Sequence, residues 1–209
     1  MHLDRITTRT LLDALPGVAY VVDLEGRILA CGQGPWREFA EANGAPALAD
    51  PRVVTGRTLT EFIEGEAARE ADACIRRSLL LSRRDRVAYD FRCDSPDRIR
   101  RMRMHIRLLR DGGEPQAFLY QSLLLSERQR PALPLFAPRL PGLLDEESPI
   151  VTACSYCKRL RHPSMLQVWL TPEEYAGNGG RNDARVSHGI CGDCYARVNA
   201  EFFGEPERS

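Results

Sequence analysis

Two Cys-x-x-Cys pairs, Cys154/Cys157 and Cys191/Cys194, limit more than any other feature how this chain can fold. Two residues between the cysteines allow a tight turn that aims both sulfurs at one point, with turn amides free to donate to the thiolates. Zn²⁺ prefers four soft ligands in a tetrahedron, and the two pairs supply them with no position left open. The sequence therefore predicts a structural four-cysteine zinc site built from two zinc knuckles.

The segment between the two pairs must form structure of its own. It contains thirty-three residues, more than the roughly 15–20 of a compact paired-knuckle module. Alternating apolar residues predict a short strand at 166–170. Thr171 and Glu174 form a capping box around Pro172 and predict the start of a helix. A closing helix is expected after Cys194, ending near residue 204.

Other roles for these cysteines agree less well with the pattern. Nothing indicates the oxidising compartment that disulfides need, and four unrelated buried cysteines would be paired this regularly only by accident. A redox dithiol stays open, because a Cys-x-x-Cys motif can lower a thiol pKa. His162 and His188 lie near the pairs and remain candidates to replace a cysteine ligand. A histidine near a knuckle more often supports the ligands or lies at the surface.

Charge and hydropathy exclude several classes of partner. The chain has 209 residues with 29 basic and 29 acidic side chains, and residues 151–209 hold seven of each. Because there is no basic excess, nucleic-acid binding is not expected. No apolar run approaches the roughly 20 residues of a membrane-spanning helix, and the start lacks a signal-peptide pattern. Seven cysteines, an odd number, suit a reducing compartment. We therefore expect a cytoplasmic protein with no membrane or nucleic-acid partner.

The first part of the chain reads as two strands, several helices and three further strands. Helices are predicted at 3–14, 36–43, 58–63 and 64–84, and strands at 18–23, 28–31, 87–93, 101–108 and 116–125. Residues 45–51 are expected to be irregular. This order implies an antiparallel sheet with helices on one face, an α+β fold.

This order of elements resembles the PAS domain of sensory proteins over roughly residues 15–126. The resemblance rests on an opening strand that ends in Asp23, on Gly26-Arg27 after it, on the helical middle and on the three closing strands. It implies a five-stranded sheet and a helical cradle for a small ligand or cofactor. PAS domains also commonly dimerise through a flanking N-terminal helix, a role that residues 3–14 would fill unless they only cover their own sheet.

The C-terminal tail carries a second resemblance. Its two motifs, Cys-Ser-Tyr-Cys at 154–157 and Ser-His-Gly-Ile-Cys-Gly-Asp-Cys at 187–194, have Trp169 and Tyr175 between them. Together they look like a tail appended to some bacterial PAS and GAF sensory and response-regulator proteins. The resemblance implies metal binding and an association with signalling.

A cofactor in the PAS cradle is an open alternative. The sequence lacks the cysteine motif of flavin photoreceptors, and the long helix at 64–84 has no histidine to ligate haem. Cys93, Met102 and Met104 would ligate haem iron if their strand face lined a pocket, although a methionine stripe more often fills a core. The alternative function is therefore a haem- or thiol-based redox or gas sensor.

These observations predict three parts: a PAS-like sensory domain with its N-terminal helix at 1–126, a Pro-rich linker at 127–150 and a zinc-binding module at 151–209. Leu135 and Phe136 favour docking of the linker over free disorder. No phosphate loop or nucleophile motif is present, and four thiolates leave no coordination position for water, so no enzymatic activity is expected. The predicted function is a cytoplasmic sensory or adaptor protein that acts through protein contacts, as a homodimer, with a small-molecule ligand remaining possible.

Overall fold

The computed structural model describes residues 6–43, 45–63, 65–136, 149–161 and 168–203. Contacts between Cα atoms divide the chain into two compact units. The first unit contains residues 1–63, 73–89 and 103–124, and the second contains residues 64–72, 90–102 and 125–209.

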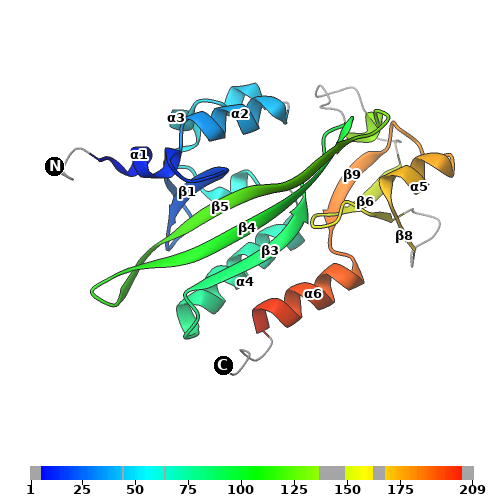
Figure 1. Cartoon of the computed structure of the whole chain (residues 1–209). Helices are drawn as coiled ribbons and strands as arrows, with labels where there is room; N and C mark the ends of the chain where they lie inside the picture. The colour runs from blue at the N-terminus through cyan, green and yellow to red at the C-terminus, as the bar shows by residue number, and fades with distance from the viewer. Residues whose placement is uncertain (1–5, 44, 64, 137–148, 162–167, 204–209) are drawn as a thin grey trace. The chain divides into compact units, whose positions relative to one another are not determined.

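A five-stranded sheet forms the first of two sheets, in the order β2-β1-β5-β4-β3 (Figure 1). The strands are β1 (Val18–Asp23), β2 (Ile28–Cys31), β3 (Arg86–Arg92), β4 (Arg98–Asp111) and β5 (Glu114–Gln129). β1 pairs antiparallel with both β2 and β5, so the first and last strands lie side by side. The predicted fold class, α+β with a PAS-like five-stranded antiparallel sheet, is confirmed.

The interior strand β1 is apolar because both of its faces are covered. On one face Tyr20 stacks on Tyr120 with ring centroids 5.0 Å apart and meets the edge of Trp36 at 5.9 Å. On the other face Ala19 belongs to a buried cluster with Leu12 of the N-terminal helix. A strand buried on both faces needs no polar alternation, which explains its continuous apolar run.

The helices between β2 and β3 contribute to the first face, and the N-terminal helix contributes to the other. The helical elements are α1 (Thr8–Asp13), α2 (Gly34–Ala42), the 3₁₀ turn η2 (Pro46–Leu48), α3 (Pro51–Val54), the 3₁₀ turn η3 (Leu59–Glu61) and α4 (Glu66–Leu81). The prediction of helices on one face therefore holds for α2, while α1 packs Leu12 against the opposite face.

The N-terminal helix is shorter than the range of 3–14 predicted from its apolar stripe. It begins at Thr8, because the Thr7 hydroxyl accepts a hydrogen bond from the Thr10 amide at 3.2 Å and caps the first turn. Leu3 lies outside the described residues, and Ile6 is exposed ahead of the cap.

Residues 45–51, predicted to be irregular, contain a 3₁₀ turn and the start of α3. Pro46 and Pro51 each occupy the start of a helical turn, where proline lacks only a hydrogen bond that would be missing anyway. Asp50 caps α3 by accepting from the Arg52 amide at 2.9 Å. The sequence predicts irregular backbone here, whereas in the structure both prolines begin helical turns.

The turn between β1 and β2 has the form expected from Asp23 and Gly26. The Asp23 carboxylate accepts from the Arg27 amide at 2.7 Å, and Gly26 has φ of +95°. A Cβ atom at Gly26 would lie 2.8 Å from the Arg76 guanidinium. Glycine is therefore needed here both for the backbone conformation and for space.

The last two strands of the sheet are longer than predicted. β4 begins at Arg98 rather than 101 and ends at Asp111 rather than 108, while β5 continues to Gln129 rather than 125. Strand β5 therefore includes the first three residues of the segment predicted as a linker. Polar residues such as Glu127 obscured the extension in the sequence, because this end of the strand is exposed and is held partly by ion pairs from Glu127 to Arg98 and Arg100 of β4.

A second, four-stranded sheet occupies the C-terminal part, in the order β8-β7-β6-β9. Its elements are β6 (Ile150–Cys154), β7 (Leu160–Arg161), β8 (Trp169–Leu170), α5 (Pro172–Gly177), β9 (Arg185–Gly189) and α6 (Gly192–Phe203), preceded by the 3₁₀ turn η4 (Pro134–Phe136). The predicted strand at 166–170 is present as β8, with residues 166–167 outside the described part. The capping box of Thr171 and Glu174 is confirmed.

Candidate metal centre

The first cysteine pair lies in the turn between β6 and β7. Cys154 ends β6, its amide donates to the Arg159 carbonyl at 2.7 Å, and its carbonyl accepts from the Lys158 amide at 2.9 Å. Lys158 has φ of +60°, a left-handed conformation that closes the turn. The turn is therefore tight enough to direct both sulfurs of the pair to the same side.

The second pair lies where β9 passes into α6. Strand β9 runs parallel to β6, with Gly189 opposite Cys154, so the chain reaches Cys191 beside the first knuckle. Cys194 lies in the first turn of α6, whose Tyr195 amide donates to the Cys191 carbonyl at 2.9 Å. A parallel pairing between segments more than thirty residues apart thus brings the two motifs together.

The four sulfurs form a group of the size that one metal ion requires. The Sγ atoms of Cys154, Cys157, Cys191 and Cys194 all lie within 4.8 Å of one another, and none of the four is in a disulfide. The Cys157 and Cys191 sulfurs are 3.7 Å apart. A tetrahedron with metal–sulfur bonds of about 2.3 Å has edges of about 3.8 Å. The four cysteines therefore fit a single tetrahedral ion.

Two guanidinium groups lie against the sulfurs and offset their negative charge. Arg159 donates to the Cys157 sulfur at 3.4 Å and to the Cys191 sulfur at 3.6 Å, and it also pairs with Asp193 at 2.5 Å. Arg197 donates to the Cys194 sulfur at 3.8 Å. Four thiolates around a divalent ion carry a net charge of −2, so two cations at this distance balance the centre.

Backbone and thiol hydrogen bonds also favour thiolate at this position. The Cys191 amide donates to the Cys154 sulfur at 3.4 Å. Hydrogen bonds from the Cys154 and Cys194 thiols, followed by that from Arg159, lower the pKa of Cys157 well below the ordinary thiol value. The Cys157 sulfur and then Asp193 raise the pKa of Arg159. The hydrogen bonds around Cys157 therefore favour its thiolate, the form that binds a metal ion.

Strand β3 contacts both knuckles within the second unit. The Arg92 amide donates to the Tyr156 carbonyl, inside the first knuckle, at 2.7 Å. Arg197, which touches the Cys194 sulfur, also donates to the Asp90 carbonyl at 3.2 Å. The end of β3 is therefore hydrogen-bonded to the metal centre at two points.

A glycine allows another close approach within the same unit. Gly65 has φ of +86°, and a Cβ atom there would lie only 2.3 Å from the His188 Cβ. His188 sits on β9 opposite Ala153. Among the described residues, the group of clustered ligand atoms holds the four cysteines and no histidine. His162 lies outside the described residues.

A buried ion network, not anticipated from the sequence, joins the segment after β5 to the loop between β3 and β4. Arg130, whose side chain is 3% exposed, pairs with the fully buried carboxylate of Asp94 at 3.1 Å and with Glu173 of α5 at 3.0 Å. It also donates to the carbonyls of Ser95 and Pro96. Arg92 pairs with Asp94 from the other side. The partners are 36 and 43 residues from Arg130 in the chain, so no local pattern indicates them.

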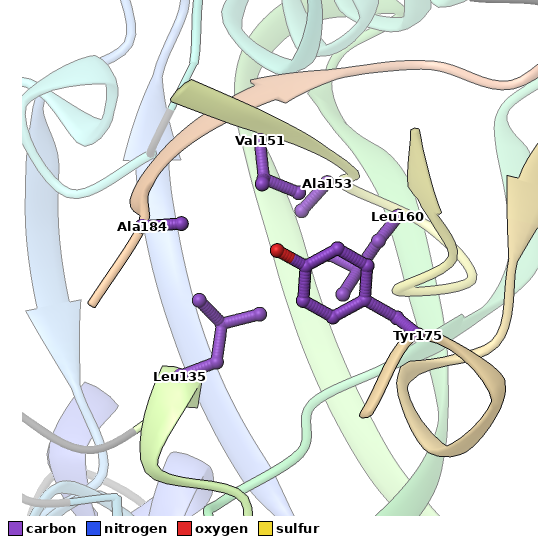
Figure 2. Packing of buried hydrophobic residues seen from close by; sticks show 6 residues of the cluster. All are labelled: Leu135, Val151, Ala153, Leu160, Tyr175 and Ala184. Atoms are coloured by element: carbon purple, nitrogen blue, oxygen red, sulfur yellow. The ribbon is translucent and has the colours of Figure 1, made fainter. Parts of the chain in front are cut away.

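A small hydrophobic cluster supports the knuckles from one side. Figure 2 shows its six side chains directed toward one another around the Tyr175 ring: Leu135, Val151, Ala153, Leu160, Tyr175 and Ala184. The Tyr175 hydroxyl donates to the Arg181 carbonyl at 3.3 Å. Leu135 belongs to η4, so the docking predicted for this part of the linker is observed. These six side chains form only a small core. A bound metal would add the stability that a module of this size lacks.

The residues proposed as haem ligands lie just after β3 and on β4. Met102 is buried and Met104 is half-buried. Cys93 directly follows β3, its amide donates to the Arg100 carbonyl at 3.1 Å, and burial raises the pKa of its thiol. Haem ligation by these residues stays a prediction.

Comparisons with known proteins identify solved structures that resemble this chain, but they do not assign the chain to a family. No family model matches the chain, and no curated protein matches it. The PAS domain of Bordetella pertussis BvgS is 22% identical, over 57% of this chain and 85% of that one, with a TM-score of 0.39. The PAS domain of an HTR-like protein from Haloarcula marismortui is 20% identical, over 56% of this chain and 88% of that one, with a TM-score of 0.37.

A third solved structure is the photoactive yellow protein domain of the sensor histidine kinase Ppr from Rhodospirillum centenum. It is 19% identical, over 56% of this chain and 92% of that one, with a TM-score of 0.38. The PAS-like description of the present fold depends on its own strand order and helices. In the part of the chain that the structure describes, no helix is both long enough and apolar enough to span a bilayer.

Proposed function

We propose that this chain is a cytoplasmic sensory or adaptor protein of the PAS type, in which one Zn²⁺ held by Cys154, Cys157, Cys191 and Cys194 stabilises the C-terminal module. The supporting observation is the closed group of four sulfurs with a guanidinium on two sides. Four thiolate ligands supplied by two Cys-x-x-Cys turns are typical of a structural zinc site. Its role is structural and not catalytic, because four protein ligands leave no position for water or substrate.

The signal leaves the protein through protein contacts, and the protein acts as a homodimer. Helix α1 packs against β1 and β2 but buries only Leu12. Leu11 on α1 is 58% exposed and Leu29 on β2 is 51% exposed. Exposed leucines on two adjacent elements supply apolar area that a second copy would cover.

Elemental analysis and light scattering test the two parts of this proposal. The purified protein should contain one zinc per chain, and Cys154→Ser or Cys191→Ser should lose it. Leu11→Asp should shift the mass measured by light scattering from dimer to monomer, because a carboxylate in an apolar interface is not solvated. Leu81→Asp is the matched control, since Leu81 is 82% exposed at the end of α4.

Different results would contradict the zinc centre and the homodimer. Protein that folds fully without any bound metal would contradict the zinc centre, while a monomeric wild type would contradict the dimer. Equal dissociation by Leu11→Asp and Leu81→Asp would also remove α1 from the interface.

A further inference from the structure

A cleft of about 550 Å³ lies in the first unit, away from the cysteines. One wall is α1, a second is the start of α2, and the third is the segment that contains η2 and the start of α3. Small-molecule sites commonly have volumes of about 300–1,000 Å³. The cleft is therefore large enough for a metabolite.

The charges that line the cleft are unbalanced. Arg9, Arg37 and Arg52 contribute three cations, and Asp50 is the acid among the lining residues. Arg52 is committed to Asp50 through contacts of 2.6, 2.9 and 3.1 Å. Among the residues that the structure describes, the side chains of Arg9 and Arg37 make no hydrogen bond or salt bridge. Two guanidinium groups from different helices thus line one cleft, and the single lining acid, Asp50, is hydrogen-bonded to Arg52 and not to either of them.

Backbone hydrogen bonds to Asp13 fix the two helices that carry these cations. The Asp13 carboxylate accepts from the Gln33 amide at 2.5 Å and from the Gly34 amide at 3.2 Å, so the end of α1 caps the start of α2. Arg9 precedes Asp13 by one helical turn. Without this cap α2 would lack one, since Gln33 makes no side-chain cap. The same contact that completes α2 places Arg9 beside the cleft.

The third wall is rigid and has few competing groups. The Trp36 indole donates to the Leu48 carbonyl at 2.7 Å and ties α2 to η2. Pro46 and Pro51 have fixed φ angles and no amide hydrogen. Hydrogen bonds from the Arg52 side chain and amide, with a smaller effect of the Arg37 charge, lower the pKa of the Asp50 carboxyl to about 2. Asp50 thus stays charged and keeps Arg52 in place at neutral pH, while Arg9 and Arg37 retain their donors.

We propose that this cleft binds a small organic anion with two acidic groups, either a dicarboxylate or a phosphorylated metabolite, through Arg9 and Arg37. The planar guanidinium fork matches a carboxylate or phosphate with two parallel hydrogen bonds. Two forks on two different walls suit a ligand with two acidic groups. This binding uses no ligand of the zinc centre, and it rests on the proposed sensory function only where it identifies the class of signal that the first unit would receive.

Isothermal titration calorimetry on the full, metal-loaded chain at low ionic strength tests the proposal. The probes are succinate, citrate and inorganic phosphate, with succinamide as the uncharged analogue of succinate. Arg9→Gln and Arg37→Gln are compared with Arg83→Gln, which removes the same charge from an exposed position of the first unit outside the cleft. All three replaced side chains are exposed, so the melting temperatures should match that of the wild type and exclude unfolding.

We expect saturable binding of at least one anionic probe at one per chain, none of succinamide, and about tenfold weaker binding after either cleft substitution. Arg83→Gln should bind like the wild type. Preference for phosphate over succinate and citrate would assign the phosphorylated class, and the reverse would assign the carboxylates. The proposal is overturned if no anionic probe binds at about 10 mM, if succinamide binds equally, or if Arg9→Gln and Arg37→Gln bind like Arg83→Gln.

Discussion

Lys158 is the residue at which the first knuckle departs from ordinary backbone geometry. Its φ of +60° lies in the left-handed region, immediately after the second cysteine of the pair. A side chain with a Cβ atom costs about 1–3 kcal/mol in this conformation, and asparagine is tolerated better than most residues. A β-branched residue is tolerated least.

Replacements at Lys158 should therefore separate backbone strain from charge. Lys158→Asn and Lys158→Val remove the same charge, but we expect the valine variant to be less stable by about 1–2 kcal/mol in the unfolding of the C-terminal module. Thermal unfolding of the metal-loaded protein, followed by the fluorescence of Trp169, measures the difference. Equal stability of the two variants would mean that the turn relaxes to another conformation.

At the scale of elements, the buried ion network around Arg130 fixes the segment that directly follows β5. Arg130→Ala would leave the fully buried carboxylate of Asp94 with Arg92 as its remaining arginine partner. Removing one partner of a buried ion pair typically costs about 3–5 kcal/mol, because the remaining charge is poorly solvated. Urea unfolding should show a loss of this order for Arg130→Ala. Arg128→Ala, at an exposed position two residues earlier, should lose less than about 0.5 kcal/mol.

If both variants lose the same amount of stability, the Arg130 network contributes no more than an exposed side chain. A loss confined to Arg130→Ala that also exposes α5 to proteases would agree with the second contact, from Arg130 to Glu173.

Elements with a strong local pattern were predictable, and elements that depend on distant partners were not. β1 and β2 follow from two apolar runs around Asp23 and Gly26, and the four sulfur ligands follow from the spacing of the cysteines. Strands β6 and β9 were missed because they are short, and β9 is half-buried throughout with no alternation. They exist as strands because they pair with each other and end at the metal centre. The Arg130 network was missed for the same reason, since its partners are far apart in the chain.

At the scale of the whole molecule, the second unit contains more than the C-terminal tail. Residues 64–72 and 90–102 group with residues 125–209. The sequence alone suggests that metal removal should loosen the tail and leave the sensory domain unchanged. The hydrogen bonds of Arg92 to Tyr156 and of Arg197 to Asp90 instead connect the end of β3 to both knuckles.

Metal removal should therefore increase hydrogen exchange in segments outside the C-terminal tail as well. Chelation, or Cys154→Ser where metal exchange is slow, removes binding energy that is part of the folding energy of the module. We expect faster amide hydrogen exchange in β6, β9 and the first turn of α6, and also in the segment 90–97, because the Arg92 amide loses the Tyr156 carbonyl when the knuckles open. Strand β1 should keep its protection, since it pairs with β2 and β5 within the first unit. Mass spectrometry of peptides from protein with and without metal resolves these segments. If residues 90–97 stay protected while β6 and β9 exchange freely, the end of β3 is held by its own sheet, and the metal centre stabilises the tail alone.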